Sequence, residues 1–204
     1  KALHDYVAAR IEYDAPAFLS GQIPDQSPER IFTTRKAVCQ GYADLLTALG
    51  QAIGEDIVTI SGYARTSFST IREGEPNHAW NAVNLSGRWY LLDATWDSGN
   101  LNESGQWVQQ YRTAYLMPPP DVLIYDHLPI ESDWQMLQSP LTLTEFEQQP
   151  DLKPQFFSAG LRLVEPTNYR TEVNGMAKIQ LENLDRQWIL ADYVEKDSSR
   201  TGEC

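Results

Sequence analysis

The sequence predicts an α+β fold, in which one long helix packs on an antiparallel sheet and a small β module follows. The helix is indicated where apolar side chains recur at the spacing of one helix face: Val38, Tyr42, Leu45, Leu46, Leu49 and Ile53. The sheet is indicated by two strand-like runs, 80–85 and 88–93, because the two residues between them favour a β-hairpin. The β module is indicated after Pro154, where apolar and polar residues alternate.

Cys39 lies within the first turn or so of the predicted helix, which we expect Thr34 to cap and Gly54 to end. Unpaired backbone N–H groups and the positive end of the helix dipole favour a thiolate there. Arg35 and Lys36 add positive charge nearby. These conditions prepare a nucleophilic cysteine, although a small apolar residue that fills the core explains this stretch equally well.

His78 and Asp93 follow Cys39 in the order that a thiol enzyme needs, because a nucleophile requires a base and the base requires an orienting group. A two-residue hairpin loop fixes the register of the two strands, which predicts that Trp80 pairs with Asp93 and His78 with Thr95. Paired residues share a face of the sheet, so His78 and Asp93 are expected to be diagonal neighbours about 7–8 Å apart at Cα. A loop one residue longer would place the two side chains on opposite faces.

Three sequence blocks together resemble the core of the transglutaminase-like superfamily: Val38-Cys39-x-Gly41-Tyr42-Ala43, His78-x-Trp80-Asn81 and Asp93-x-Thr95-Trp96. Later segments resemble the branch that includes kyphoscoliosis-peptidase-type proteins: Tyr115-Leu116-Met117-Pro118, His127-Leu128-Pro129 and Trp134-Gln135-Met136-Leu137. The resemblance covers residues 1–160 and is densest from 31 to 137. It implies a papain-like thiol-enzyme fold with Cys39 as nucleophile, His78 as its histidine and Asp93 as its aspartate.

The expected activity is acyl transfer on peptide or amide bonds through a thioester. Cys39 attacks a carbonyl carbon, His78 takes the thiol proton, and Asp93 holds the imidazole. Water as acceptor gives a cysteine peptidase or amidase, which the branch resemblance favours. A lysine amine as acceptor gives a cross-linking transglutaminase, and a catalytically silent transglutaminase-like binding module is the third alternative.

The tetrahedral oxyanion is expected to bind the backbone N–H of Cys39 at the helix start, together with a second donor that the sequence leaves open. Large aromatic residues more often build a core than a binding wall. The candidates for this donor and for contacts with the substrate are Gln40, Trp80 and Trp96, joined by Gln22 and Gln26 in the preceding loop.

The two other histidines are interpreted as non-catalytic. His4 falls on the polar side of a helix predicted for residues 1–13, which places it on the surface. His127 lies in an extended segment bounded by proline and is interpreted as structural. A short helix over 142–148 is expected from the capping box that Thr142 and Glu145 provide, and loops are expected at 14–29 and 67–77.

The composition excludes several classes of partner. A net charge of −12 argues against nucleic acid and anionic membranes, and no apolar run approaches the ~20 residues of a membrane span. Two cysteines make no disulfide framework. Because no histidine or cysteine pair has metal-ligand spacing, neither a metal nor another cofactor is expected. The localisation stays open, with secretion included if an export signal has been removed.

Two domains are expected: a transglutaminase-like catalytic domain at 1–150 and a β module at 151–204. An immunoglobulin-type sandwich needs about seven strands, so the module is expected to be partial or truncated at residue 204. Because Lys1 is not a natural start, further domains are expected in the full-length protein. The strands of the module are predicted at 156–164, 169–173, 176–181 and 188–194.

Overall fold

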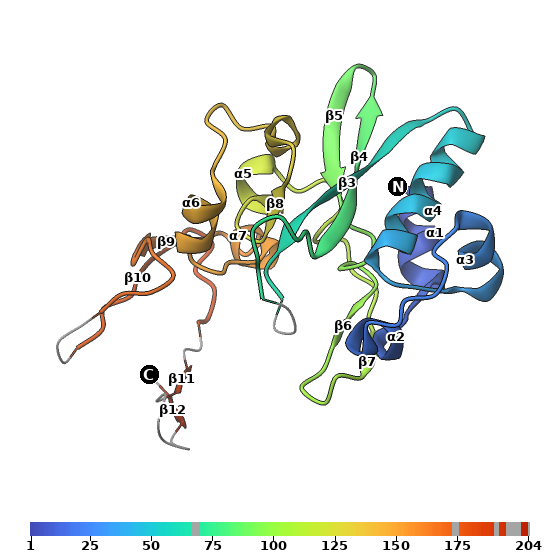
Figure 1. The fold of residues 1–204 in the computed structure, drawn as a ribbon. Coiled ribbons are helices and arrows are strands. Elements are labelled where there is room, and N and C mark those ends of the chain that lie inside the picture. The colour runs from blue at the N-terminus through green and yellow to red at the C-terminus, as the bar shows by residue number, and fades with distance from the viewer. Residues whose placement is uncertain (67–69, 173–175, 190–191, 195–200, 204) are drawn as a thin grey trace.

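The computed structural model describes residues 1–66, 70–172, 176–189, 192–194 and 201–203 of the chain (Figure 1). The helices are α1 (Ala2–Arg10), α2 (Ala15–Ser20), α3 (Pro28–Thr34), α4 (Cys39–Ala52), α5 (Pro120–Leu123), α6 (Leu143–Gln148), α7 (Pro154–Ser158) and the 3₁₀ helix η1 (Ser132–Gln135). The strands are β1 (Glu12–Tyr13), β2 (Lys36–Ala37), β3 (Asp56–Ala64), β4 (His78–Leu85), β5 (Arg88–Leu92), β6 (Gly99–Leu101), β7 (Trp107–Gln109), β8 (His127–Pro129), β9 (Leu161–Glu165), β10 (Gln180–Asn183), β11 (Asp192–Val194) and β12 (Thr201–Glu203). None of the helices in these described ranges is long and apolar enough to cross a membrane.

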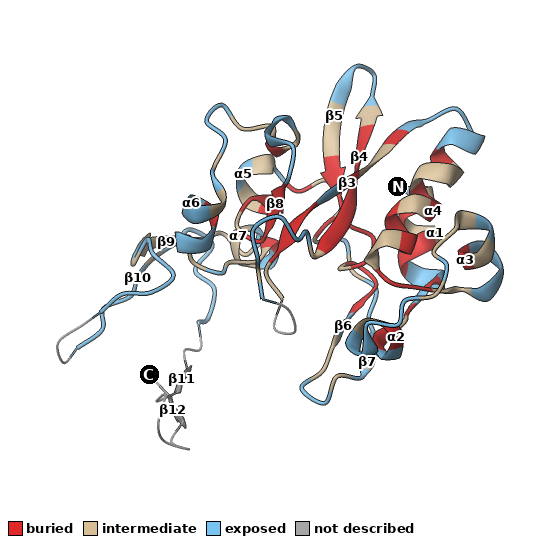
Figure 2. Cartoon of the chain, viewed as in Figure 1, coloured by how far each residue is buried: buried red, intermediate tan, exposed pale blue. Residues whose placement is uncertain are grey.

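A four-stranded antiparallel sheet in the order β5-β4-β3-β8 carries helix α4 on one face (Figure 1). Of the predicted apolar stripe, Tyr42, Leu45 and Leu46 are buried in this core, whereas Ile53 is the C-cap of α4 and is exposed. Figure 2 shows buried residues concentrated in α4 and the sheet, whereas the residues of β9 and β10 are of intermediate exposure or exposed. The predicted α+β class, with the helix of Cys39 packed on an antiparallel sheet, is confirmed.

Helix α4 begins at Cys39 because the residues before it are held in extended backbone. Strand β2 pairs in parallel with β1, and Val38 keeps an extended conformation as the N-cap. Thr34 was predicted to cap this helix, and that prediction is wrong. Thr34 ends α3, where its hydroxyl donates to the carbonyl of Arg30.

A close approach of side chains explains the glycine two residues after Cys39. A Cβ at Gly41 would lie 2.5 Å from Gln26 Oε1 and 2.8 Å from the Cβ of Ala37. Both distances are below any contact that a real Cβ makes. The side chain of Gln26 could move aside, but the Cβ of Ala37 is fixed to its backbone, so this close packing of Ala37 on the helix start favours a glycine.

The hairpin of β4 and β5 has the predicted two-residue loop. Ser86 and Gly87 both have positive φ, as a type I′ turn requires, and the pairing runs from Leu85–Arg88 to Asn81–Leu92. The further pairs predicted for Asp93 and Thr95 do not form. The ladder ends at Leu92 because the backbone N–H of Asp93 donates instead to the carbonyl of Tyr115.

Asn81 ties helix α4 to the sheet. Its side-chain Nδ2 donates to the carbonyl of Ala43 in α4 at 2.9 Å and to the carbonyl of Val58 in β3 at 3.2 Å. The same nitrogen donates to the hydroxyl of Thr47 at 3.1 Å. Asn81 therefore holds the backbone of α4 against that of β3.

The N-terminal segment differs from its prediction in three places. The helix predicted for 1–13 ends at Arg10 and is followed by strand β1. The loop expected at 14–29 contains α2 and the start of α3, because Pro16 and Pro28 lie in first turns, where proline is tolerated. The surface position predicted for His4 is also wrong. His4 is 1% exposed, with its Nε2 3.1 Å from Oδ2 of the buried Asp97, so this histidine joins α1 to the loop that follows Asp93.

The predicted helix over 142–148 is confirmed, since Thr142 caps α6 in a capping box with Glu145. After it, the strand predicted from Phe156 begins as helix α7, because Pro154 fixes a φ suited to a first helical turn. β9 starts only at Leu161.

The other three strands predicted for the β module are shorter than expected or absent. Residues 169–172 form no strand, and residue 173 lies outside the described residues. The strand predicted at 176–181 begins at Gln180. Of the strand predicted at 188–194, Asp192–Val194 is observed, and 190–191 lie outside the described residues. The predicted domain boundary at residue 150 stays a prediction.

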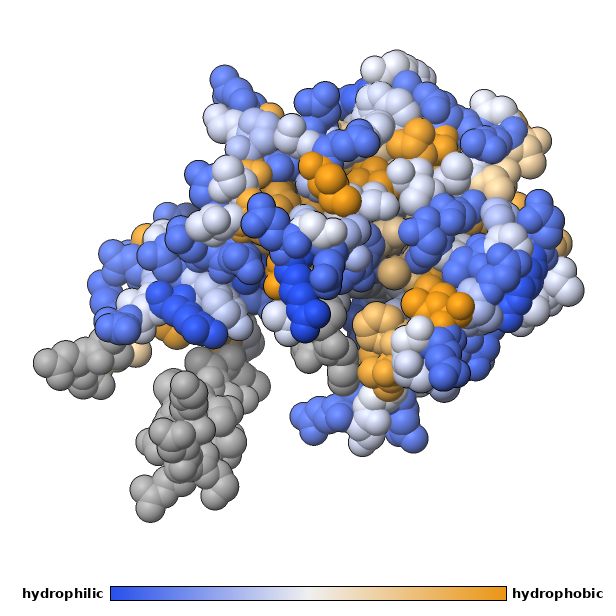
Figure 3. Space-filling view, viewed as in Figure 1, coloured by the Kyte–Doolittle hydropathy of each residue, from blue (hydrophilic) through white to orange (hydrophobic). Residues whose placement is uncertain are grey.

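An apolar patch lies over α2 and the neighbouring β6–β7 hairpin on the face shown in Figure 3. It includes the exposed side chains of Leu19 and Val108. The proline-rich segment before α4 and the loop after Asp93 therefore share one apolar surface.

Candidate active site

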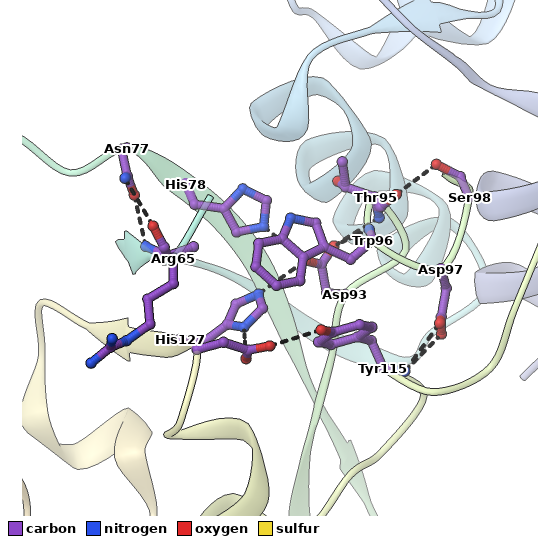
Figure 4. A network of polar contacts seen from close by, with 12 residues as sticks. Arg65, Asn77, His78, Asp93, Thr95, Trp96, Asp97, Ser98, Tyr115 and His127 are labelled. Atoms are coloured by element: carbon purple, nitrogen blue, oxygen red, sulfur yellow. Dashed lines mark hydrogen bonds and ion pairs between the residues drawn. The ribbon is translucent and has the colours of Figure 1, made fainter. Parts of the chain in front are cut away.

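The three predicted catalytic residues come from three separate elements. Cys39 is the half-buried first residue of α4, His78 is the first residue of β4, and Asp93 directly follows β5. His78 and Asp93 are buried, and the Nε2 of His78 lies 2.7 Å from the Oδ2 of Asp93 (Figure 4). The hairpin register predicted this proximity, although the strands separate one residue before Asp93.

The electrostatics of this group favour a protonated histidine. Burial by itself lowers the pKa of His78, but the charge of Asp93, its hydrogen bond and the interaction with Cys39 outweigh burial and raise the pKa to about 10. Burial likewise acts to raise the pKa of Asp93. The charge of His78 and the hydrogen bonds from His127 and His78 outweigh it and hold that pKa well below its usual range. An imidazolium beside Cys39 is the partner that stabilises a thiolate.

The carboxylate of Asp93 is fixed by backbone as well as by histidine. Its Oδ1 accepts hydrogen bonds from the backbone N–H groups of Thr95 at 2.7 Å and Trp96 at 3.1 Å. These bonds close a turn directly after β5 and leave Oδ2 for the histidines. The block Asp93-x-Thr95-Trp96 therefore forms a local turn that orients Oδ2 of Asp93 toward the histidines.

A second histidine reaches the same oxygen. His127 Nε2 lies 3.1 Å from Oδ2 of Asp93, and its Nδ1 lies 2.6 Å from Oδ1 of Asp126 (Figure 4). The interpretation of His127 as merely structural did not anticipate this contact. His127 opens β8, whose pairing with β3 places it opposite Ala64. A three-residue strand that pairs across more than sixty residues leaves no local pattern, so the only sequence signal was an aspartate beside a histidine.

His78, Asp93 and His127 also offer three ligand-type atoms that all lie within 4.8 Å of one another. Nitrogen and carboxylate oxygen are suitable ligands for zinc and related metals. The expectation of no metal rested on sequence spacing, and these positions converge only in three dimensions. Both nitrogens hydrogen-bond to one carboxylate oxygen, so we interpret the group as a hydrogen-bond network.

The candidate substrate and oxyanion residues are placed in different surroundings. Trp80 is 1% exposed and packs against the rings of His78 and His127, with centroids 6.0 and 5.0 Å away. Trp96 is partly exposed, lines the cleft, and lies 5.4 Å from the ring of His78. The side chain of Gln40 donates to Asp44 Oδ2 at 2.8 Å, one turn along α4.

The two glutamines of the preceding segment also differ in position. Gln26 accepts a hydrogen bond from the backbone N–H of Val38 at 3.0 Å and donates to the carbonyl of Pro24 at 2.8 Å. Gln22 is exposed and lies earlier in the chain than Gln26. Gln26 therefore braces the start of α4, immediately before Cys39.

A cleft of about 420 Å³ opens beside His78. Tyr13 and Phe18 of the N-terminal segment form part of its wall. Its charged lining residues are three cations and one carboxylate: Arg65, Arg112, Lys153 and Asp151. The cleft is therefore locally basic in a chain whose net charge is −12.

Comparison with known proteins identifies the family of the N-terminal part of the chain. Residues 1–94, which include Cys39, His78 and Asp93, match the model of the transglutaminase-like superfamily. The chain carries a domain of this superfamily. The predicted resemblance is thereby confirmed at the level of the family.

Curated relatives of the transglutaminase-like chain include kyphoscoliosis peptidases. The protein of Mus musculus is 34% identical over 192 residues, which cover 90% of this chain and 28% of that protein. The protein of Homo sapiens is 33% identical with the same coverage. The chain thus spans less than a third of the length of these relatives. Among solved structures, a candidate cysteine protease from Cytophaga hutchinsonii is 27% identical and covers 53% of this chain and 33% of its own, with a TM-score of 0.36.

Proposed function

We propose that the transglutaminase-like chain is an acyl-transfer enzyme that acts on peptide or amide bonds through a thioester on Cys39. The observation that carries the proposal is the buried 2.7 Å hydrogen bond between His78 and Asp93, with Cys39 interacting with the same imidazole at the start of α4. A nucleophile, a base and an orienting carboxylate in contact are what thiol catalysis requires. The substrate class is a protein or peptide.

In the proposed mechanism, Asp93 engages Nε2 of His78, which leaves Nδ1 for the thiol of Cys39. The thiol proton moves to His78, and the thiolate attacks the carbonyl carbon to form a tetrahedral intermediate. His78 then gives the proton to the leaving amine, and the thioester remains. Asp93 stays ionised throughout and stabilises the imidazolium.

The oxyanion is proposed to bind backbone N–H groups in the first turn of α4. The first four N–H groups of a helix have no partner within the helix, and Cys39 and Gln40 are the first two residues of α4. The side chain of Gln40 already donates to Asp44, so its contribution is assigned to the backbone. Trp96, on the cleft wall beside His78, is the proposed substrate contact, whereas the burial of Trp80 fits a supporting role.

Hydrolysis is the proposed fate of the thioester, and amine transfer is the second candidate. The relatives that are named peptidases favour water as the acceptor. The superfamily match, which is named for transglutaminases, favours a lysine amine. Both reactions use the same three residues, so only the acceptor side of the cleft distinguishes them.

A cysteine-directed activity probe separates an enzyme from a silent binding module. The wild-type chain should be labelled at Cys39, while Cys39→Ala and His78→Ala should not be labelled. Leu19→Ala, on the exposed surface of α2, serves as a control that should label like the wild type. Equal labelling of wild type and His78→Ala would overturn the proposed base.

The fate of the thioester is tested with glutamine- and asparagine-containing peptides, with and without a primary amine. A hydrolase releases ammonia or new peptide ends at a rate that the amine hardly changes. A transglutaminase incorporates the amine, which then diverts product from hydrolysis. Amine incorporation faster than hydrolysis would replace the first candidate by the second and leave the three roles unchanged.

A further inference from the structure

His127 lies between two buried carboxylates, and the proposed reaction assigns it no task. Nε2 contacts Asp93 at 3.1 Å and Nδ1 contacts Asp126 at 2.6 Å, and all three side chains are at most 1% exposed. A neutral imidazole has one N–H donor and one acceptor, whereas a carboxylate offers acceptors alone. Two ionised carboxylates at the two nitrogens therefore require hydrogen at both, which is an imidazolium.

The surroundings of Asp126 favour its carboxylate form. Besides His127, its Oδ2 accepts a hydrogen bond from the hydroxyl of Tyr115 at 2.7 Å and lies 3.6 Å from the ammonium of Lys153. A hydroxyl donor and a nearby ammonium, independent of His127, stabilise the anion of this buried carboxyl group. A neutral His127 would require a proton on Oδ1 of Asp126 instead, and the carboxyl group would then lose the negative charge that the hydroxyl of Tyr115 and the ammonium of Lys153 stabilise at Oδ2.

The ring of His127 has little freedom to turn away from these partners. It sits among four aromatic rings at centroid distances of 4.4 to 5.5 Å: Trp96, Trp80, His78 and Tyr115. Its backbone is held by the pairing of β8 with β3. The charged and titratable groups that surround it are Asp93, Asp126, His78, Tyr115 and Lys153.

We propose that His127 is a positioning residue that donates from both ring nitrogens, as an imidazolium, to Asp93 and Asp126. This inference rests on the proposed function, in which Asp93 orients His78. The donation fixes Oδ2 of Asp93 at the point where His78 meets it. It also shares the negative charge of Asp93 between two histidines. Asp93 then stabilises the imidazolium of His78 less strongly, and His78 can still give up its proton.

The protonation of His127 is tested directly, without any substrate. Ring nitrogens are observed by NMR in ¹⁵N-histidine-labelled protein, and the His127 signals are assigned as those missing in His127→Gln. Both ring nitrogens of His127 should be protonated at neutral pH, and Asp126→Asn should convert the ring to a neutral form. A neutral ring in the wild-type protein would overturn the inference whether or not the chain is an enzyme.

The positioning role is tested by kinetics. The assay is turnover of a substrate or the rate of Cys39 alkylation, whichever the experiments under the proposed function establish. His127→Leu removes the donor and should lower kcat/KM about 10- to 100-fold, the usual effect of losing one hydrogen bond to a charged group. His127→Gln retains an N–H donor and should recover part of that loss. The alkaline limb of the pH profile should move to higher pH in His127→Leu, because Asp93 then acts on His78 alone.

His4→Gln is the matched control, since His4 is another buried histidine beside a buried aspartate, Asp97. It should lose stability but keep the pH profile, with each variant assayed below its own unfolding temperature. An unchanged pH profile in His127→Leu, or the same shift in His4→Gln, would reduce His127 to a packing residue. If the wild type neither turns over a substrate nor alkylates selectively at Cys39, the proposed function fails, and the NMR result still decides the state of His127.

Discussion

Asp93 Oδ2 lies 2.7 Å from His78 Nε2 although the two residues are not partners in the β4–β5 ladder. The hairpin brings them near each other, and a turn that two backbone N–H groups close onto Asp93 Oδ1 completes the approach. The function of Asp93 is therefore separable from the sheet. This relationship allows the carboxylate to be changed while the strands stay paired.

Replacing Asp93 with Asn should leave the fold intact and reduce turnover strongly. The amide is close in size, but it has no charge to stabilise the imidazolium, and it can hold His78 in the wrong tautomer. The corresponding change in the serine triad costs about 10⁴-fold in kcat. Circular dichroism should stay unchanged while kcat is measured. Near-wild-type kcat would mean that another group orients His78.

Cys39 should react with iodoacetamide faster than Cys204 at mildly acidic pH. The helix start and the raised pKa of His78 favour an ion pair of thiolate and imidazolium, and the thiolate is the reactive form. Mass spectrometry of the alkylated peptides measures both rates in one sample. His78→Ala should abolish the difference, and equal rates in the wild type would remove the support for Cys39 as nucleophile.

Stability should fall as the pH rises above neutrality. The pKa of His78 is raised from 6.5 to about 10 because Asp93 and Cys39 outweigh the opposing effect of burial. A group with a raised pKa stabilises the fold fully below its unfolded pKa, and that stabilisation is lost as pH rises through the folded pKa. Urea unfolding between pH 6.5 and 10 should show a steeper loss for the wild type than for His78→Gln.

On the acid side, the change of stability with pH should have the opposite sign. The pKa of Asp93 lies below its usual 3.8, so its stabilisation is present above that pH and is lost as pH falls toward the folded value. Asp93→Asn should flatten this acid limb. An acid limb as steep in Asp93→Asn as in the wild type would assign the acid sensitivity to other carboxylates.

Replacing Asn81 with Ala should destabilise the chain by about 1–3 kcal/mol, because it leaves buried carbonyl groups of α4 and β3 without their donor. Urea unfolding measures the change. Gln51→Ala, at the exposed end of α4, is the control and should stay within about 0.5 kcal/mol of the wild type. Equal stability of the two variants would show that Asn81 does not hold the helix to the sheet.

Local patterns in the sequence predicted the parts of this protein that depend on neighbours in the chain. The apolar period set the buried face of α4, and the two-residue loop set the β4–β5 register, because both follow from backbone geometry within a few residues. Together they placed Cys39 at the start of α4 and brought His78 near Asp93, although Asp93 lies one residue beyond β5 and not in the strand as predicted. Thr34 and the prolines of 14–29 misled for the same reason, since capping and helix-breaking preferences do not say which helix a residue belongs to.

Tertiary structure alone decided the contacts between segments far apart in the chain. Nothing local pairs the three residues of β8 with β3, yet that pairing brings His127 to Asp93. Likewise, only the packing of α1 buries His4 against Asp97. Such contacts follow from burying apolar surface over the whole domain, and a polar residue carried inward then takes whichever partner the fold provides. The sequence thus determined the three residues proposed for catalysis, whereas the folded chain decided what surrounds Asp93.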